Sequence, residues 1–135
     1  MSSKTSAAGL RIGELARLSG RSAHTIRWYE AQRLMPGAAR DAAGRRVFEQ
    51  AHVDWLELMD RLRRSGMSIR QMQAYARQVA QGKATLRARR DLLSEHRARV
   101  EGQIGELRQA LDLLDRKLAL YDGWIAKHAP PDAGG

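Results

Sequence analysis

The sequence predicts a mainly α-helical protein in two parts, a compact winged helix-turn-helix region followed by a long C-terminal helix. Apolar residues recur with helical spacing on both sides of Gly20. Two short extended pieces flank a loop at residues 40–44, which is the pattern of a small hairpin or wing. From Leu86 onward, apolar residues recur at every seventh position, as they do in coiled coils.

Residues 12–30 predict two short helices separated by a glycine. The first helix carries its apolar residues near one face: Ile12, Leu15, Ala16 and Leu18. Gly20 ends this helix, because glycine readily adopts the left-handed conformation found at helix C-termini. Ser22 then offers an N-cap oxygen to the second helix, in which Ile26 and Tyr29 share a face. This spacing is typical of a helix-turn-helix.

The second helix leaves one surface free to contact a partner. Its candidate outward residues are Ala23, His24, Thr25, Arg27 and Trp28. A helix with a free surface of this kind can enter the major groove of duplex DNA. The pattern therefore favours a nucleic-acid reader.

The segment that follows predicts a wing and two further helices. Residues 34–48 read as two short extended pieces, and the loop 40–44 joining them contains the Asp and Gly that suit a turn. A new helical period begins at Gln50 and ends at Gly66. Ser68 can cap the next helix, and Gly82 closes the compact region.

The long C-terminal helix carries a heptad seam. One row is formed by Leu86, Leu93, Val100, Leu107, Leu114 and Tyr121, and a second by Ile104, Leu111, Leu118 and Ile125. Arg90 and Arg97 occupy the second row nearer the N-terminus, so the seam is narrower there. A helix of about 40 residues extends about 60 Å, which exceeds what a small domain can cover. We therefore expect the stripe to meet another chain through Leu93, Val100, Ile104, Leu107, Leu111, Leu114 and Leu118.

Composition points to a polyanionic partner. The 135-residue chain has a formal net charge of +9 and a pI near 11.0. It has one Phe, so stacking on single strands is less favoured than neutralising the backbone of a duplex. It has no cysteine, which excludes disulfides, thiolate metal sites, iron–sulfur clusters and a cysteine nucleophile.

Targeting signals are not expected in this chain. No apolar run approaches the roughly 20 residues of a membrane span, and the polar residues 1–6 lack the apolar centre of a signal peptide. We therefore expect a cytoplasmic protein, associated with the bacterial nucleoid and without a membrane partner.

Five short segments form a specific set of motifs: Ile12-Gly-Glu-Leu-Ala16, Thr25-Ile-Arg-Trp-Tyr-Glu30, Leu34 to Pro36, Gly44-Arg-Arg-Val-Phe48 and Leu62-Arg-Arg-Ser-Gly-Met-Ser68. Through this set the chain strongly resembles the MerR family of transcriptional regulators. The resemblance covers roughly residues 11–80 in detail, and the long helix fits the family in kind.

The resemblance implies a homodimer that binds double-stranded promoter DNA. Two recognition helices would enter successive major grooves, the wings would lie on the flanking backbone, and the long helices would cross antiparallel. In such regulators the activated dimer kinks and untwists an overlong promoter spacer, so that both promoter elements face RNA polymerase, an indirect partner. A substantial bend of this kind costs on the order of 1 to 6 kcal/mol.

The resemblance also implies a set of DNA-binding residues. They are Ser22, Thr25, Arg27, Trp28, Arg40, Arg45, Arg46 and Arg63. Thr25 and Arg27 would contact bases or phosphates, and Trp28 would pack on the backbone. Each arginine could instead be a solvated surface charge. We favour phosphate contact for the wing pair, Arg45 and Arg46, and leave the choice open for Arg40 and Arg63. Tyr29 and Phe48 are assigned to the core.

One position departs from the family pattern. The family usually has glycine where this chain has Arg33, just after the recognition helix. A left-handed cap at Arg33 would be strained or differently built, and this affects the expected angle of the wing.

The sequence does not identify an effector. Relatives that sense metals or superoxide use cysteines near the ends of the long helix, and this chain has none. We predict no cofactor and no metal site. The target genes and the choice between activation and repression stay open.

An aromatic and apolar cluster ends the long helix: Tyr121, Trp124 and Ile125. It could line an effector pocket, or it could dock the helix end against the partner chain. We favour docking, because such rows are usually packed as core. Gly102 and Gly105 each cost a helix about 1 kcal/mol relative to Ala, and they permit either close approach of a partner helix or a bend.

The histidines are predicted to have no special role. His96 has Asp91 and Glu95 nearby, which makes a metal site imaginable. A solvated histidine on a charged helix is the simpler interpretation. His128 receives the same interpretation, and so does His52, as a first-turn residue.

These residues discriminate among three classes of function. A dimeric, sequence-specific transcriptional regulator fits best, and the alternative is a protein-interaction adaptor with a MerR-like helix-turn-helix. An enzyme is excluded, because there is no cysteine nucleophile, no phosphate-binding glycine loop after a strand and no recognised catalytic spacing. The predicted organisation is a disordered N-terminus (1–9), a DNA-binding domain (10–82), a dimerisation coiled coil (85–128) and a disordered tail (129–135).

Overall fold

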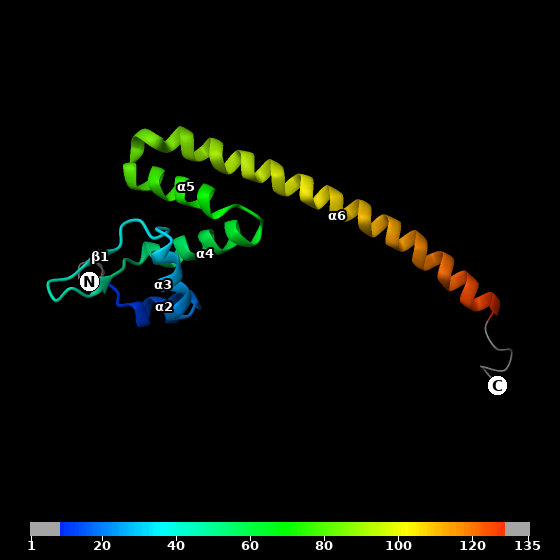
Figure 1. The fold of residues 1–135 in the computed structure, drawn as a ribbon, viewed down its shortest axis with the longest axis horizontal. Helices are drawn as coiled ribbons and strands as arrows, with labels where there is room; N and C mark the ends of the chain where they lie inside the picture. Colours follow the sequence, from blue (N-terminus) through cyan, green and yellow to red (C-terminus); the bar gives the residue numbers. More distant parts are fainter. Residues whose placement is uncertain (1–8, 129–135) are drawn as a thin grey trace. The chain divides into compact units, whose positions relative to one another are not determined.

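The computed structural model describes residues 9–128, and within them the fold is mainly helical. The elements are α2 (Ile12–Ser19), α3 (Ala23–Ala31), β1 (Ala39–Arg40), β2 (Arg46–Val47), α4 (Ala51–Arg64), α5 (Ile69–Gln81), a 3-10 turn (Lys83–Thr85) and α6 (Leu86–His128), shown in Figure 1. Except for Gly9, the segments predicted to be disordered lie outside the described residues. Within residues 9–128, none of the helices has the length and apolarity needed to span a bilayer.

The chain divides into two units, residues 1–96 and 97–135, and each is described by itself. The first unit holds the helix-turn-helix, the wing, α4, α5 and the beginning of α6. The second unit, as far as it is described, is the rest of α6.

The helix-turn-helix forms where the sequence places its start and stop signals. α2 ends at Gly20, whose φ of 71° is left-handed. Ser22 has an extended backbone, and its Oγ accepts a hydrogen bond from the Thr25 N–H at 3.1 Å, so it caps α3. Leu15 is fully buried, whereas Leu18 stays 42% exposed, because it lies at the edge of the apolar face.

The wing is a two-stranded antiparallel hairpin. β1 pairs with β2, with Arg40 opposite Arg46. Asp41 organises the turn, because its Oδ1 accepts hydrogen bonds from the backbone N–H groups of Ala43 (3.0 Å) and Arg45 (2.8 Å). The segment before α2 also joins the wing, through a pair of backbone hydrogen bonds between Leu10 and Phe48 of 2.7 and 2.8 Å.

One hydrophobic core connects these elements. Its fully buried side chains are Leu15, Ile26, Tyr29, Leu34, Phe48, Leu56, Met59 and Met72, so Tyr29 and Phe48 are core residues as predicted. Trp55 stacks on Tyr75 with ring centroids 5.6 Å apart, and its indole N–H donates to the Leu34 carbonyl at 2.6 Å. α4 and α5 are thereby fixed to the end of the helix-turn-helix.

Two histidines, His52 in the first turn of α4 and His96 in α6, are buried. His52 is 4% exposed; its Nδ1 accepts from the Glu49 N–H at 2.9 Å, and its Nε2 lies 2.7 Å from the Pro36 carbonyl oxygen. His96 is 5% exposed, with Nε2 2.8 Å from Ser65 Oγ at the end of α4. The interpretation of His96 as a solvated residue was wrong, because the first turns of α6 pack over the core and cover it.

The second unit presents a largely exposed helix. The exposed large apolar side chains of residues 97–128 are Ile104, Leu107, Leu111, Leu113, Leu114, Leu118, Leu120, Tyr121, Trp124 and Ile125. Leu93 belongs to the first unit and packs partly on the chain's own core. Gly102 and Gly105 have open space where a Cβ would lie, so the single chain gives no packing reason for either glycine.

Candidate nucleic-acid interface

The recognition helix α3 presents a polar face to solvent. Arg27 and His24 are exposed, and Thr25 and Trp28 are partly buried. The Ser22 hydroxyl is exposed but donates to Thr25 Oγ1 at 3.0 Å, so these two side chains form one capping unit. Trp28 packs edge-on against Tyr29 at 5.2 Å, which fixes the orientation of its ring.

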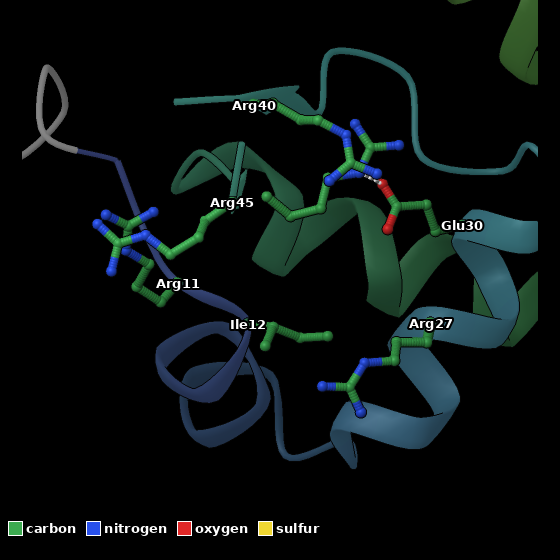
Figure 2. A pocket seen from close by; sticks show the side chains of 7 residues that line it. Arg11, Ile12, Arg27, Glu30, Arg40 and Arg45 are labelled. Atoms are coloured by element: carbon green, nitrogen blue, oxygen red, sulfur yellow. Dashed lines mark ion pairs between the residues drawn. The ribbon is translucent and has the colours of Figure 1, made fainter. Parts of the chain in front are cut away.

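A basic groove runs between α3 and the wing. It has a volume of about 420 Å³ and is lined by Arg11, Ile12, Arg27, Glu30, Arg40, Arg45 and Arg46. Figure 2 shows Arg27 on the α3 side and Arg40 and Arg45 on the other side, with Ile12 between them. Five arginines outnumber the two carboxylates that pair with them, Glu30 and Asp41, so the concave surface is net positive and attracts phosphate groups.

The wing arginines differ in how they are held. Arg46 forms an ion pair with Glu30 of α3 and is 33% exposed, so it links the wing to the recognition helix. Arg45 is 66% exposed, and its Nε lies 3.4 Å from Asp41. Arg40 donates to the Gly44 carbonyl at 2.8 Å across the turn.

Asp41 is the acidic centre of the wing. The Arg45 backbone N–H, followed by the Arg11 side chain at 2.6 Å, lowers the pKa of the Asp41 carboxyl from 3.8 to about 2. The carboxylate is therefore ionised at all physiological pH values, and it fixes the turn that presents Arg45.

A second, smaller hollow lies beside the start of α3. It has a volume of about 160 Å³ and is lined by His24, Thr25, Trp28 and Arg63. Arg63 comes from α4, and its guanidinium carbon lies 5.7 Å from the centre of the Trp28 ring. The structure thus brings Arg63 next to three residues of the recognition helix.

Three residues of this surface were missed by sequence reasoning: Arg11, Arg21 and Asp60. Asp60 is 8% exposed and lies 3.0 Å from both Arg63 and Arg64, which are three and four residues further along α4. That spacing was a readable signal. The contact with Arg21 spans 39 residues, and no local pattern predicts it.

No three His, Cys, Asp or Glu side chains of residues 9–128 lie close enough together to share a metal ion. The end-of-helix cluster lies in the second unit. Tyr121 and Trp124 pack edge to face with centroids 5.2 Å apart, and both are exposed in the single chain, as is Ile125.

The helix-turn-helix, the wing and the basic groove between them define a DNA-binding protein that reads a duplex. Comparison with known proteins agrees with this class. Residues 10–79 match the model of the family described as MerR HTH family regulatory protein. The chain belongs to the MerR family, whose members are transcriptional regulators and not enzymes.

Individual relatives support the same assignment. The chain is 37% identical over 102 residues to an uncharacterised HTH-type transcriptional regulator of Haemophilus influenzae, covering 76% of each chain. A putative MerR family regulator from Listeria monocytogenes has a similar structure, with 37% identity, a TM-score of 0.76 and coverage of 84% of this chain and 86% of that one.

The chain is also similar to a regulator whose structure was solved in complex with DNA. HiNmlR, described as a MerR family regulator lacking the sensor domain and bound to promoter DNA, has 34% identity and a TM-score of 0.73. The match covers 86% of this chain and 92% of HiNmlR. The present protein is therefore a DNA-binding transcriptional regulator.

Proposed function

We propose that the protein is a homodimer that binds promoter DNA sequence-specifically, with α3 in the major groove and the wing on the neighbouring backbone. The groove between α3 and the wing carries this proposal, because five arginines line it and outnumber the two carboxylates that pair with them, Glu30 and Asp41. Contacts to phosphates position such a protein, and contacts to base edges give it specificity. HiNmlR, which this chain resembles over most of its length, was solved on promoter DNA.

The candidate contacts take different roles in this proposal. Arg27 is exposed on α3 and is the best placed to read a base, since arginine recognises guanine through two hydrogen bonds. Arg45 and Arg40 contact phosphates from the wing. Arg46 acts mainly through Glu30, holding the wing at a fixed angle to α3.

The dimer is proposed from the second unit. Ile104, Leu107, Leu111, Leu114, Leu118, Tyr121 and Ile125 alternate in steps of three and four residues, and all of them are more than 40% exposed. A continuous apolar stripe of this kind is rare on a monomeric protein. A second copy of the same helix, crossing antiparallel, would cover it.

The consequence for transcription follows from the two linked DNA-binding units of the dimer. A dimer that grips two successive major grooves can bend and untwist the DNA between them, and so change how RNA polymerase meets the promoter. We propose that an effector controls this change. A protein that works on promoter DNA acts in the bacterial cytoplasm, at the nucleoid.

Selection from a random duplex library, followed by footprinting of the DNA upstream of the protein's own gene, tests DNA recognition. We expect two half-sites related by two-fold symmetry. Arg27→Ala should relax the preference at one position in each half-site, by about 1–3 kcal/mol. Arg99→Ala, which removes an exposed arginine of the second unit, is the matched control. Uniform, salt-sensitive coating of every duplex would count against the proposal, and no binding at low salt would favour the adaptor alternative.

Sedimentation of two double variants tests the dimer. Leu107→Glu with Leu114→Glu places charges in the seam, and we expect a monomer that binds DNA weakly. Leu113→Glu with Leu120→Glu places the same charges on exposed positions outside the seam, and this variant should remain a dimer. A dimer of the first variant would show that the seam is not the interface.

A further inference from the structure

Asp60 is a buried acidic residue on the α4 side of the DNA-binding unit, where the phosphate-attracting surface gives no reason for a negative charge. It is 8% exposed. Three guanidinium groups surround its carboxylate: Arg21 at 3.1 Å, Arg63 at 3.0 Å and Arg64 at 3.0 Å. Arg21 comes from the turn between α2 and α3, so this carboxylate joins the helix-turn-helix to α4.

The hydrogen bonds around Asp60 fix one arginine more than the others. Arg63 donates through Nη2 to Asp60 Oδ1 at 3.0 Å and through Nε to the Tyr29 hydroxyl at 3.2 Å. Tyr29 in turn donates to the same Oδ1 at 3.4 Å, which closes a ring of three side chains. The guanidinium of Arg63 also lies over the rings of Trp28 (5.7 Å) and Tyr29 (5.8 Å).

Arg63 nevertheless remains available to a ligand. Its side chain is 42% exposed, and it lines the hollow beside His24 and Thr25 at the start of the recognition helix. Three arginines around one carboxylate leave a positive surplus, so the cluster still attracts phosphate. An arginine that is already immobilised loses less conformational entropy on binding than a free one.

We propose that Asp60 is a positioning residue for DNA binding, which holds Arg63 against Tyr29 and Trp28 as a preset phosphate contact beside the recognition helix. This inference rests on the proposed function, because it deepens the role of the same surface. Asp60 lowers the total positive charge of the cluster by one, and it holds the Arg63 side chain in a defined geometry. A preset contact meets its phosphate only when base contacts of α3 hold the protein in one register, so the expected benefit appears on the specifically bound duplex rather than in general affinity for DNA.

The central test is Asp60→Asn, compared with Asp54→Asn. Both changes remove one negative charge from α4, but Asp54 is exposed and forms no ion pair with another residue of the range 9–128. The probes are the duplex selected by the wild-type protein and a scrambled duplex of the same length, titrated at several salt concentrations. We expect Asp60→Asn to bind the selected duplex about tenfold more weakly and the scrambled duplex unchanged or more tightly.

A purely structural role predicts a different result. It would lower thermal stability while the folded variant kept the wild-type ratio of affinities for the two duplexes. A ratio within twofold of the wild type, or an equal effect of Asp54→Asn, would overturn the inference. Failure of the wild-type protein to bind any duplex would overturn the proposed function instead, so the two failures can be told apart.

A second variant keeps the test decisive if Asp60→Asn does not fold. Arg63→Lys retains the charge but loses the planar guanidinium fork, which bonds Tyr29 and Asp60 in a fixed geometry and lies over the Trp28 ring. We expect about tenfold weaker binding to the selected duplex with an unchanged salt slope. In the double variant with Asp60→Asn the two losses should not add, since they act through one contact. Wild-type affinity of Arg63→Lys would contradict the inference.

An NMR signal provides a readout that is independent of DNA. The Arg63 Nε–H should give a resonance protected by its bond to the Tyr29 hydroxyl, assigned by its loss in Arg63→Lys. Asp60→Asn should shift and broaden this resonance, and Asp54→Asn should not. An unchanged resonance in Asp60→Asn would show that Asp60 does not position Arg63.

Discussion

Replacing Arg33 by glycine should stabilise the DNA-binding unit. Arg33 follows the end of α3 with a φ of 60°, and it has the only positive φ among the non-glycine residues that the structure describes. Its N–H bonds to the Glu30 carbonyl and the Leu34 N–H to the Tyr29 carbonyl, both at 2.9 Å. These two bonds are those of a Schellman motif, in which the left-handed residue is usually glycine.

The C-terminus of α4 has the same kind of cap with glycine at the left-handed position. α4 ends with the same pair of bonds, at 3.1 and 2.9 Å, and there the left-handed residue is Gly66, with a φ of 99°. An L-residue in this conformation costs about 1–2 kcal/mol. Glycine removes this cost, but about 0.5–1 kcal/mol of the gain is lost again because glycine increases the conformational entropy of the unfolded chain. The net gain for Arg33→Gly is about 0.5–1 kcal/mol, or about 2–8 °C in Tm for a small domain.

Thermal and urea unfolding, followed by circular dichroism, measure this gain. All samples need the same protein concentration, because the stability of a dimer depends on it. Arg33→Ala is the control, since alanine keeps the Cβ and the strain but loses the guanidinium, which lines a hollow with Gln73 and Arg77. If Arg33→Gly melts no higher than Arg33→Ala, the left-handed cap is not strained and the reasoning fails.

The wing supplies three further predictions. Arg45→Ala should lower the slope of log K against log salt by about 1 on all sequences, with little change in stability, because Arg45 is largely exposed; an unchanged slope would remove it from the interface. Arg46→Ala should also lower the Tm, since it leaves the partly buried Glu30 without its ion pair, and a Tm equal to that of Arg45→Ala would contradict this. The turn should hold above about pH 4 and loosen as the pH falls toward 2, because the pKa of Asp41 is lowered from 3.8 to about 2. The Arg45 amide shift in NMR reports this titration, and a midpoint near 3.8 would refute it.

Local signals in the sequence were enough to predict the elements of the DNA-binding unit. Ser22 and Ser68 cap α3 and α5 as expected. A serine directly before an apolar helical period can accept a hydrogen bond from a free backbone N–H in the first turn of the helix. The Asp and Gly of the loop 40–44 form the wing turn, where Gly44 has a φ of 82°. A left-handed cap at Arg33 was also foreseeable, since this residue stands where the family usually has glycine at a helix end.

Contacts between distant segments could not be predicted in the same way. Arg46 was expected to be a phosphate anchor, but its pairing with Glu30 depends on how the wing folds back on α3. His96 is surrounded by charged neighbours in the sequence, and only the packing of α6 over the end of α4 buries it. The centre of the arginine cluster at Asp60 likewise exists only once α4 and the helix-turn-helix have met.

The pairing of Leu10 with Phe48 has a practical consequence for anyone who handles this protein. The described residues begin beside the wing, where Leu10 bonds to Phe48 and a Cβ at Gly9 would collide with the Val47 side chain. A purification tag or fluorescent label attached just ahead of Gly9 would therefore emerge next to the hairpin that is proposed to touch DNA. Affinities measured on such fusions need a tag-free sample for comparison.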